Sequence, residues 1–183
     1  RSRGLGDVYK RQSYPSLGSR FDLIAGYKQN IDGHDNQFGY LKPSFSIDYP
    51  LIPSGFAVFA TKIGGAAIIG DEYEFYHAAT LGGNRSLRGY RNHRFNGKYS
   101  FYHSTDLRTA LGLIRTDFIP LIVGVSAGFD YGRVWTEDDD THKWHNNYGG
   151  SFWINGFYAL TANVGYYHGG DGGRVTFTIN FKY

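Results

Sequence analysis

The segment Leu81-Gly-Gly-Asn-Arg-Ser-Leu-Arg-Gly-Tyr90 decides how this chain is organised, because it lacks the apolar–polar alternation of the segments around it. A loop is therefore predicted over residues 82–103. Farther along, Asp130 lies on the polar face of a segment in which every second residue is apolar. An arginine on a glycine-rich loop and an aspartate on a strand form strong charge-assisted hydrogen bonds, most usefully where water is scarce. We therefore predict a direct contact between Arg88 and Asp130.

Apolar residues recur at every second position over most of the chain, which predicts about eight strands and no helix. The clearest alternation covers residues 174–183, 121–135, 41–51 and 106–113. Weaker alternation covers residues near 21–31, 55–69, 148–155 and 157–168, with the register of 55–69 left open. The sequence thus predicts an all-β, antiparallel fold.

The connections between these strands alternate between two kinds. Longer polar connections are predicted at 32–38, 82–103, 136–147 and 169–173. Short ones are predicted at 50–55, at 115–120 and at Asn155-Gly156, a dipeptide typical of two-residue hairpins. Long loops at one end and short turns at the other are typical of outer-membrane barrels. A soluble β-sandwich also alternates, but this order of connections favours the barrel.

The composition agrees with a chain made of strands and turns. There are 16 tyrosines, 14 phenylalanines and 26 glycines but only 5 prolines. The absence of cysteine excludes a disulfide scaffold and a cysteine-based zinc site. No segment approaches the ~18 apolar residues of a membrane helix, so any crossing must use strands.

The formal charge of +3 comes from the first twelve residues. Basic and acidic residues balance from Ser13 onward, so we expect no nucleic-acid partner. Residues 1–12 follow neither a strand nor a helix period, and we expect them to be a non-native leader. We also expect the chain to be the C-terminal piece of a longer protein.

The loop and the aspartate strand together resemble the BamA/TamA-like superfamily of outer-membrane assembly proteins and two-partner-secretion transporters. The residues that carry this resemblance are Gly82, Gly83, Leu87, Arg88, Gly89 and Tyr90 in the loop, with Phe129, Asp130 and Gly132 in the strand. Leu87 stands where the superfamily usually has valine. The resemblance implies that the loop fills a barrel lumen and docks on Asp130. Asp106 and Arg108, on the polar face of the neighbouring strand, are candidates for the same network.

The resemblance also implies a sixteen-stranded transmembrane barrel, of which residues 13–183 supply about the last eight strands as an open half-barrel. Eight closed strands leave room only for side chains, so a plug loop with several arginines would not fit inside them. The apolar face is then expected to meet lipid, and it carries Val123, Val125, Phe129, Tyr131, Phe177, Ile179 and Phe181. The last strand matches the C-terminal signal of barrel substrates at Phe177, Ile179, Phe181 and Tyr183.

The function implied by the resemblance is the insertion or translocation of other proteins in the outer membrane of Gram-negative bacteria. The expected partners are outer-membrane lipid, unfolded outer-membrane or secreted client proteins, and periplasmic or lipoprotein accessory subunits. Two alternatives stay open at this point. One is a passive outer-membrane channel or adhesin barrel, and the other is a soluble lectin-like β-sandwich.

No pattern in the sequence indicates an enzyme, a cofactor or a metal site. The acidic run 137–140, with His142 and His145 nearby, is interpreted as a solvated loop because it has no fixed geometry. The remaining histidines are scattered, and the motifs of serine hydrolases, zinc peptidases and phosphate loops do not occur. We therefore predict that the chain is not an enzyme.

Overall fold

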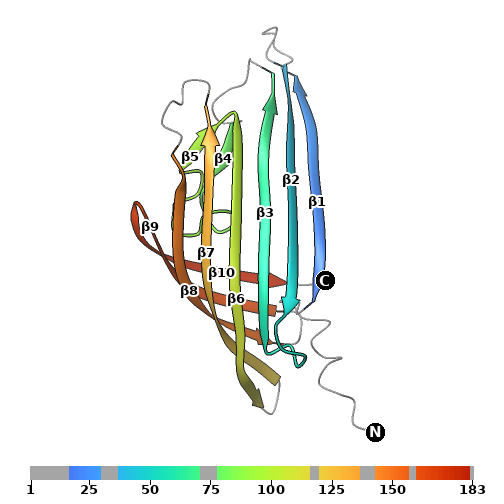
Figure 1. The fold of residues 1–183 in the computed structure, drawn as a ribbon, viewed down its shortest axis with the longest axis vertical. Helices are drawn as coiled ribbons and strands as arrows, with labels where there is room; N and C mark the ends of the chain where they lie inside the picture. The colour runs from blue at the N-terminus through green and yellow to red at the C-terminus, as the bar shows by residue number, and fades with distance from the viewer. Residues whose placement is uncertain are drawn as a thin grey trace.

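The computed structural model describes residues 17–29, 37–70, 78–115, 120–136, 143–156 and 160–181. They form one eight-stranded antiparallel sheet and one two-stranded hairpin (Figure 1). The strands of the large sheet are β1 (Gly18–Gln29), β2 (Gln37–Pro50), β3 (Ala57–Ile69), β6 (Tyr99–Arg115), β7 (Pro120–Trp135), β8 (His145–Gly156), β9 (Leu160–Gly169) and β10 (Gly172–Phe181). The described parts of the chain contain no helix with the length and apolarity needed to cross a bilayer.

Each strand of the large sheet pairs with its nearest sheet neighbour along the chain, in the order β1-β2-β3-β6-β7-β8-β9-β10. Between β3 and β6 the chain leaves the sheet and forms the hairpin of β4 (Ala79–Leu81) and β5 (Phe95–Gly97). The sheet curls so that β8–β10 pass behind the other strands in Figure 1. Among the described residues, β1 and β10 do not pair with each other, so the sheet is open, as predicted.

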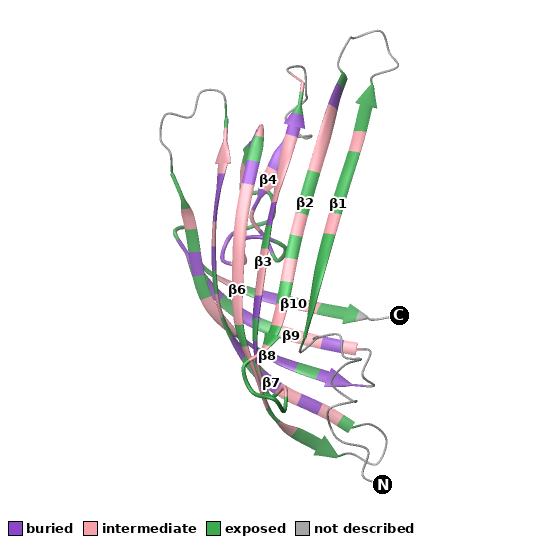
Figure 2. Ribbon diagram, turned by 45° about the vertical axis from the view of Figure 1, so that its right-hand side comes forward, coloured by how far each residue is buried: buried purple, intermediate pink, exposed green. Residues whose placement is uncertain are grey.

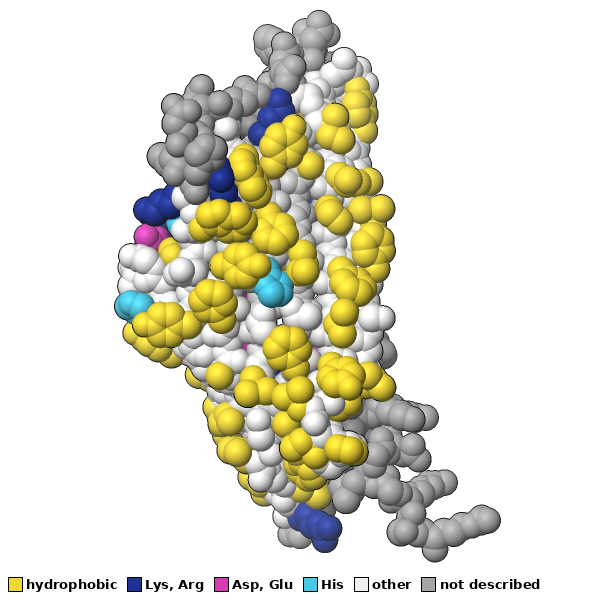
Figure 3. Space-filling view, in the orientation of Figure 1, with side chains coloured by type: hydrophobic (Ala, Val, Ile, Leu, Met, Phe, Trp, Pro, Cys, Tyr) yellow, Lys and Arg dark blue, Asp and Glu magenta, His cyan; other side chains and the backbone are white. Residues whose placement is uncertain are grey.

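The two faces of the sheet differ sharply in polarity. The outer face is apolar and exposed, and it includes Phe45, Ile63, Leu107, Val125, Phe129, Phe152, Phe177 and Ile179. Hydrophobic side chains are spread over much of the face that the space-filling view shows (Figure 3). The inner face holds buried polar side chains, among them Ser126, Asp130, Asn147, Ser151, Asn155 and Thr161. This is the reverse of a soluble sheet, whose exposed face is polar.

The alternation along single strands follows from this two-faced sheet. Buried and exposed residues alternate along β7 and β8 (Figure 2). In β3, where the sequence left the register open, Val58 and Ala60 are buried while Phe59 and Ile63 are exposed on the outer face. Of the residues predicted to face outward, Val123 and Tyr131 are half-buried, and the side chain of Phe181 lies outside the described residues.

Several connections differ from their prediction. Strand β8 begins at His145, inside the predicted connection 136–147. Strand β6 begins at Tyr99, although residues 99–103 were assigned to the loop. Both faces of that segment are aromatic, since Phe101 and His103 face outward while Tyr102 packs against the loop, and this hides the alternation. The predicted connection 169–173 is a two-residue turn, because Gly169 pairs with Gly172.

The predicted Asn155-Gly156 turn is also wrong, because both residues belong to β8. They pair with Thr161 and Leu160 of β9. Asn155 is buried, and its Nδ2 donates a hydrogen bond to Thr161 Oγ1 at 2.7 Å. An asparagine that finds this partner in a neighbouring strand does not need the turn geometry that its dipeptide favours. Residues 1–12, 137–142 and Tyr183, which carried other predictions, lie outside the described residues.

Candidate functional site: the arginine loop

The segment 82–90, here called the arginine loop, folds into two consecutive tight turns on the inner face of the sheet. Gly82 and Gly83 adopt φ angles of 116° and 92°, a region that favours glycine. The Gly82 N–H donates to Ser86 Oγ at 3.0 Å, and the Gly83 N–H donates to the Leu87 carbonyl at 2.9 Å. The Tyr90 N–H in turn donates to the Leu87 carbonyl at 3.2 Å. These bonds fix the backbone from which Arg88 projects.

An apolar cluster anchors the loop against the sheet. Leu81, Leu87 and Tyr90 are all buried and in mutual contact, and Leu87 has no exposed surface. Phe95 and Tyr102 pack against this cluster from β5 and β6. Position 87 therefore needs an apolar side chain.

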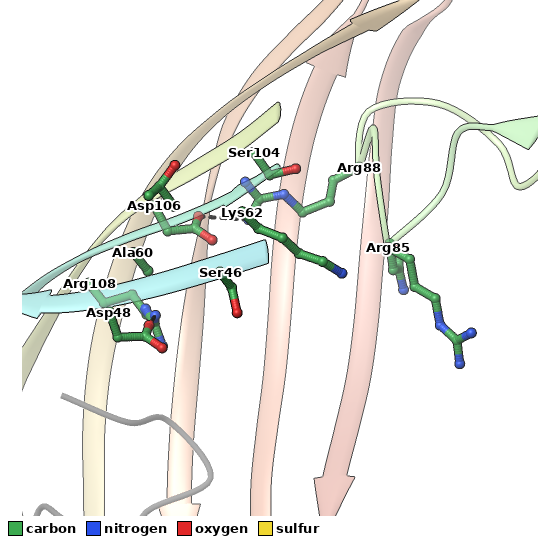
Figure 4. A pocket seen from close by; sticks show the side chains of 11 residues that line it. Ser46, Asp48, Ala60, Lys62, Arg85, Arg88, Ser104, Asp106 and Arg108 are labelled. Carbon is green, nitrogen blue, oxygen red and sulfur yellow. Dashed lines mark hydrogen bonds and ion pairs between the residues drawn. The ribbon is translucent and has the colours of Figure 1, made fainter. Parts of the chain in front are cut away.

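Arg88 binds two carboxylates from two neighbouring strands. Its Nε and Nη2 donate to Asp130 Oδ2 and Oδ1 of β7 at 2.9 and 2.6 Å, a bidentate arrangement. Its Nη1 donates to Asp106 Oδ1 of β6 at 2.7 Å. The predicted contact between Arg88 and Asp130 is therefore confirmed, and Asp106 joins it (Figure 4 shows the Arg88–Asp106 pair).

A third strand contributes an aromatic ring to the same arginine. Arg88 Nη1 also donates to the hydroxyl of Tyr167 in β9 at 2.8 Å. The guanidinium carbon lies 4.3 Å from the centre of the Tyr167 ring, within the range of a cation–π contact. One arginine thus links β6, β7 and β9.

Asp130 is fully buried and fully used as an acceptor. Besides the Arg88 side chain, it accepts the Arg88 backbone N–H at 3.1 Å and Asn147 Nδ2 of β8 at 2.8 Å. Because a buried carboxylate without partners is strongly unfavourable, these four hydrogen bonds explain how the charge is accommodated. Asn147 was not singled out from the sequence.

Glycine at position 128 makes room for this cluster. A Cβ atom on Gly128 would lie 2.5 Å from both Arg88 Nη2 and Asp106 Oδ1. A Cβ on Gly132 would lie 2.5 Å from the Phe101 carbonyl oxygen and 3.1 Å from the side chain of Leu81, which packs against the loop. The small residues on the inner face of β7 therefore permit the close approach of the arginine loop.

The electrostatic setting keeps Arg88 charged. Burial on its own would lower the pKa of Arg88. The hydrogen bond to Asp130 and the negative charges of Asp106 and Asp130 outweigh that effect, so the pKa is raised above its ordinary value. The guanidinium therefore stays cationic near neutral pH and acts as a hydrogen-bond donor and positive charge.

A second set of contacts holds the far side of the loop. The Tyr90 hydroxyl donates to the Asn146 carbonyl at 2.9 Å and accepts the Gly170 N–H at 2.8 Å. Arg174 Nη1 of β10 donates to the Tyr90 carbonyl at 2.6 Å. Arg94 forms an ion pair with Asp171 at 2.5 Å. The loop is therefore tied to the β8 start and to the β9–β10 hairpin as well as to β6 and β7.

Some predicted residues lie apart from the arginine loop. Arg108 pairs with Asp48 of β2 instead of binding the loop. Phe129 lies on the outer face, as do Phe177 and Ile179 of the last strand. Three residues that hold the loop, Asn147, Tyr167 and Arg174, were missed. Their only signal is a polar position in an alternating strand, which many other residues share.

The described residues contain no group of three or more histidine, aspartate and glutamate side chains that could hold a metal ion. A scan against protein-family models finds no match for this chain, and a search of curated proteins finds none either.

Proposed function

We propose that this chain is part of an outer-membrane β-barrel that inserts or translocates other proteins in a Gram-negative bacterium. The observation that carries the proposal is the arginine loop, which is docked through Arg88 on the polar inner face of an open sheet with an apolar outer face. This is the arrangement that the resemblance to the BamA/TamA-like superfamily implies.

The outer face supports a lipid environment over a soluble sandwich. Aromatic residues gather at its loop end, where Tyr99, Phe101, Tyr131, Trp135 and Trp144 lie near one another. Exposed aromatic and aliphatic side chains follow along the rest of the strands, among them Phe59, Leu107, Val125 and Phe129. An aromatic girdle beside an apolar band is typical of membrane barrels.

The strands are long enough for this environment. A tilted strand needs roughly 9–11 residues to span the hydrocarbon core. The shortest strand of the large sheet has 10 residues and β6 has 17. The proposed membrane band therefore fits every strand of the sheet.

The open edges support a barrel with more strands than the eight described here. Unpaired N–H and C=O groups facing lipid each cost several kcal/mol, so β1 and β10 need further strands as partners. Closing the eight strands on themselves would leave no room for the arginine loop. The resemblance implies a sixteen-stranded barrel, whose remaining strands would satisfy both edges.

The proposed activity needs no covalent chemistry. A client strand would pair with an open strand edge through backbone hydrogen bonds, a mode that depends on an accessible edge and a stable curvature. The arginine loop would stabilise that curvature by connecting β6, β7, β8 and β9. Accessory subunits and lipid would complete the working assembly.

The test is a client-insertion assay with the intact barrel protein in liposomes. A urea-unfolded outer-membrane client is diluted into the liposomes, and its folding is followed by heat-modifiable migration. We expect the wild-type protein to accelerate folding and Arg88→Ala to lose most of the acceleration. Ion conductance without acceleration would support a passive channel instead. A monodisperse protein in detergent-free buffer would support the β-sandwich.

A further inference from the structure

A hollow of about 340 Å³ lies beside the arginine loop, between the loop and the inner faces of β2, β3 and β6 (Figure 4). This volume falls at the lower end of the range of small-molecule sites, about 300–1,000 Å³. Two contacts that dock the loop lie in the wall of the hollow, the Arg88–Asp106 pair and the hydrogen bond from Ser104 Oγ to the Ser86 carbonyl at 2.9 Å.

The lining of the hollow has more cationic than anionic side chains. Both carboxylates in the lining are already engaged, Asp106 with Arg88 and Asp48 with Arg108. Arg88 is further neutralised by Asp130, behind the hollow. Among the charged side chains of this lining, those left without an ion-pair partner are cationic.

These charges belong to Lys62 of β3 and Arg85 of the arginine loop, which line the hollow from the sheet and from the loop (Figure 4). Neither forms an ion pair with any residue that the structure describes. Lys62 lies 5.5 Å from the centre of the Tyr102 ring, a contact that supplies no anionic oxygen to its ammonium group. Arg85 is exposed, but its backbone position is fixed by the turn hydrogen bonds of Gly83 and Ser86.

We infer that this hollow binds an oxyanion, a phosphate or a carboxylate group, between Lys62 and Arg85. A lysine offers a point charge and an arginine offers a planar fork of donors, and the two together match the oxygens of such a group. The Ser46 hydroxyl, in the same lining, offers a further donor. The inference goes beyond the proposed function, because it rests on the charges of the hollow and not on client insertion.

The test measures binding to the intact barrel protein in detergent at low ionic strength. Inorganic phosphate is titrated first, and a blocked Asp-Asp dipeptide is titrated second, each by calorimetry. We expect saturable binding of at least one probe, weakened about tenfold by Lys62→Gln and by Arg85→Gln, as suits the loss of one charged hydrogen bond. The probe that binds more tightly identifies the source of the oxyanion.

Two control variants remove the same charge outside the hollow. Lys42→Gln alters a lysine in β2 that lies over Tyr40 at 5.3 Å, much as Lys62 lies over Tyr102. Arg91→Gln alters an exposed arginine just beyond the same loop. Equal weakening by the controls, or no saturable binding of either probe below about 10 mM, would overturn the inference. Unchanged heat-modifiable migration of each variant shows that its sheet is intact, and client insertion is not part of the readout.

Discussion

At the scale of single residues, Arg88 is the centre of the structure because its donors reach three strands at once. Asp130, Asp106 and Tyr167 come from β7, β6 and β9, and each accepts one or more of its N–H groups. Asp130 has no exposed surface, so it depends on these hydrogen bonds in a way that a solvated aspartate does not. Removing the arginine leaves a buried charge, and this is the main reason to expect a large effect.

The first prediction is that Arg88→Ala releases the arginine loop while the sheet stays folded. Breaking a buried ion pair from one side costs on the order of 3–5 kcal/mol, and we expect this loss in the local stability of the loop. Hydrogen exchange of the loop amides in the intact protein measures it. Arg91→Ala, at an exposed position, is the control and should change little. Equal protection of the loop in both variants would contradict the role given to Arg88.

The second prediction concerns Gly128. Alanine here would place a methyl group 2.5 Å from Arg88 Nη2, so the guanidinium must move away from Asp130 or Asp106. Overpacking of this kind costs typically about 1–3 kcal/mol. The free energy of unfolding in urea, measured in detergent, should fall for Gly128→Ala. Gly112→Ala is the matched control, because a Cβ there meets nothing within 4 Å. A loss as large in the control would show that strand glycines matter for another reason.

At the scale of strands, alternation predicted the elements well, because apolar residues predominate on one face of most strands. It failed where both faces carry similar residues, as in Tyr99–His103, where inward Tyr102 is as aromatic as its outward neighbours. Local turn chemistry failed at Asn155, because a partner in β9 outweighed the dipeptide preference. In the site, the contact between Arg88 and Asp130 could be predicted, because the sequence itself marks the glycine-rich loop and the alternating strand that carry them. Asn147 and Arg174 could not, because only the register of the folded sheet brings them to the loop.

The third prediction tests the two faces of one strand. In β10, Phe177 is 60% exposed on the outer face, while its neighbour Thr178 points to the inner face. An arginine on a lipid face costs about 2–4 kcal/mol near the bilayer midplane and less toward the interfaces. Phe177→Arg should therefore destabilise the intact protein in liposomes more than Thr178→Arg does, as measured by urea unfolding. Equal tolerance of the two substitutions would exclude a lipid-facing outer surface.

At the scale of the whole molecule, the open sheet and the docked loop depend on each other. The loop occupies the concave side, where it is held by contacts to β6–β10. Strands β1–β3 extend the sheet away from this anchored part, and no other strand in the described part of the chain pairs with the outer edge of β1 (Figure 1). The eight strands can bring β1 to β10 only by tightening the curvature of the sheet. This would break the hydrogen bonds and ion pairs that hold the loop on the inner face.

The last prediction follows from these two edges. In a polypeptide limited to residues 1–183, none of the described strands pairs with the outer edge of β1 or of β10. Such edges are unfavourable in lipid and prone to association in water. We expect this polypeptide to aggregate or stay unfolded when diluted from urea into detergent micelles, whereas the larger barrel that we propose should give a compact, heat-modifiable, monomeric band. The loop variant Arg88→Ala distinguishes the cause of any closure. If the short polypeptide closes only when Arg88 is replaced, the docked loop is what keeps the sheet open. If it closes with Arg88 in place, eight strands suffice, and a small passive barrel becomes the better interpretation.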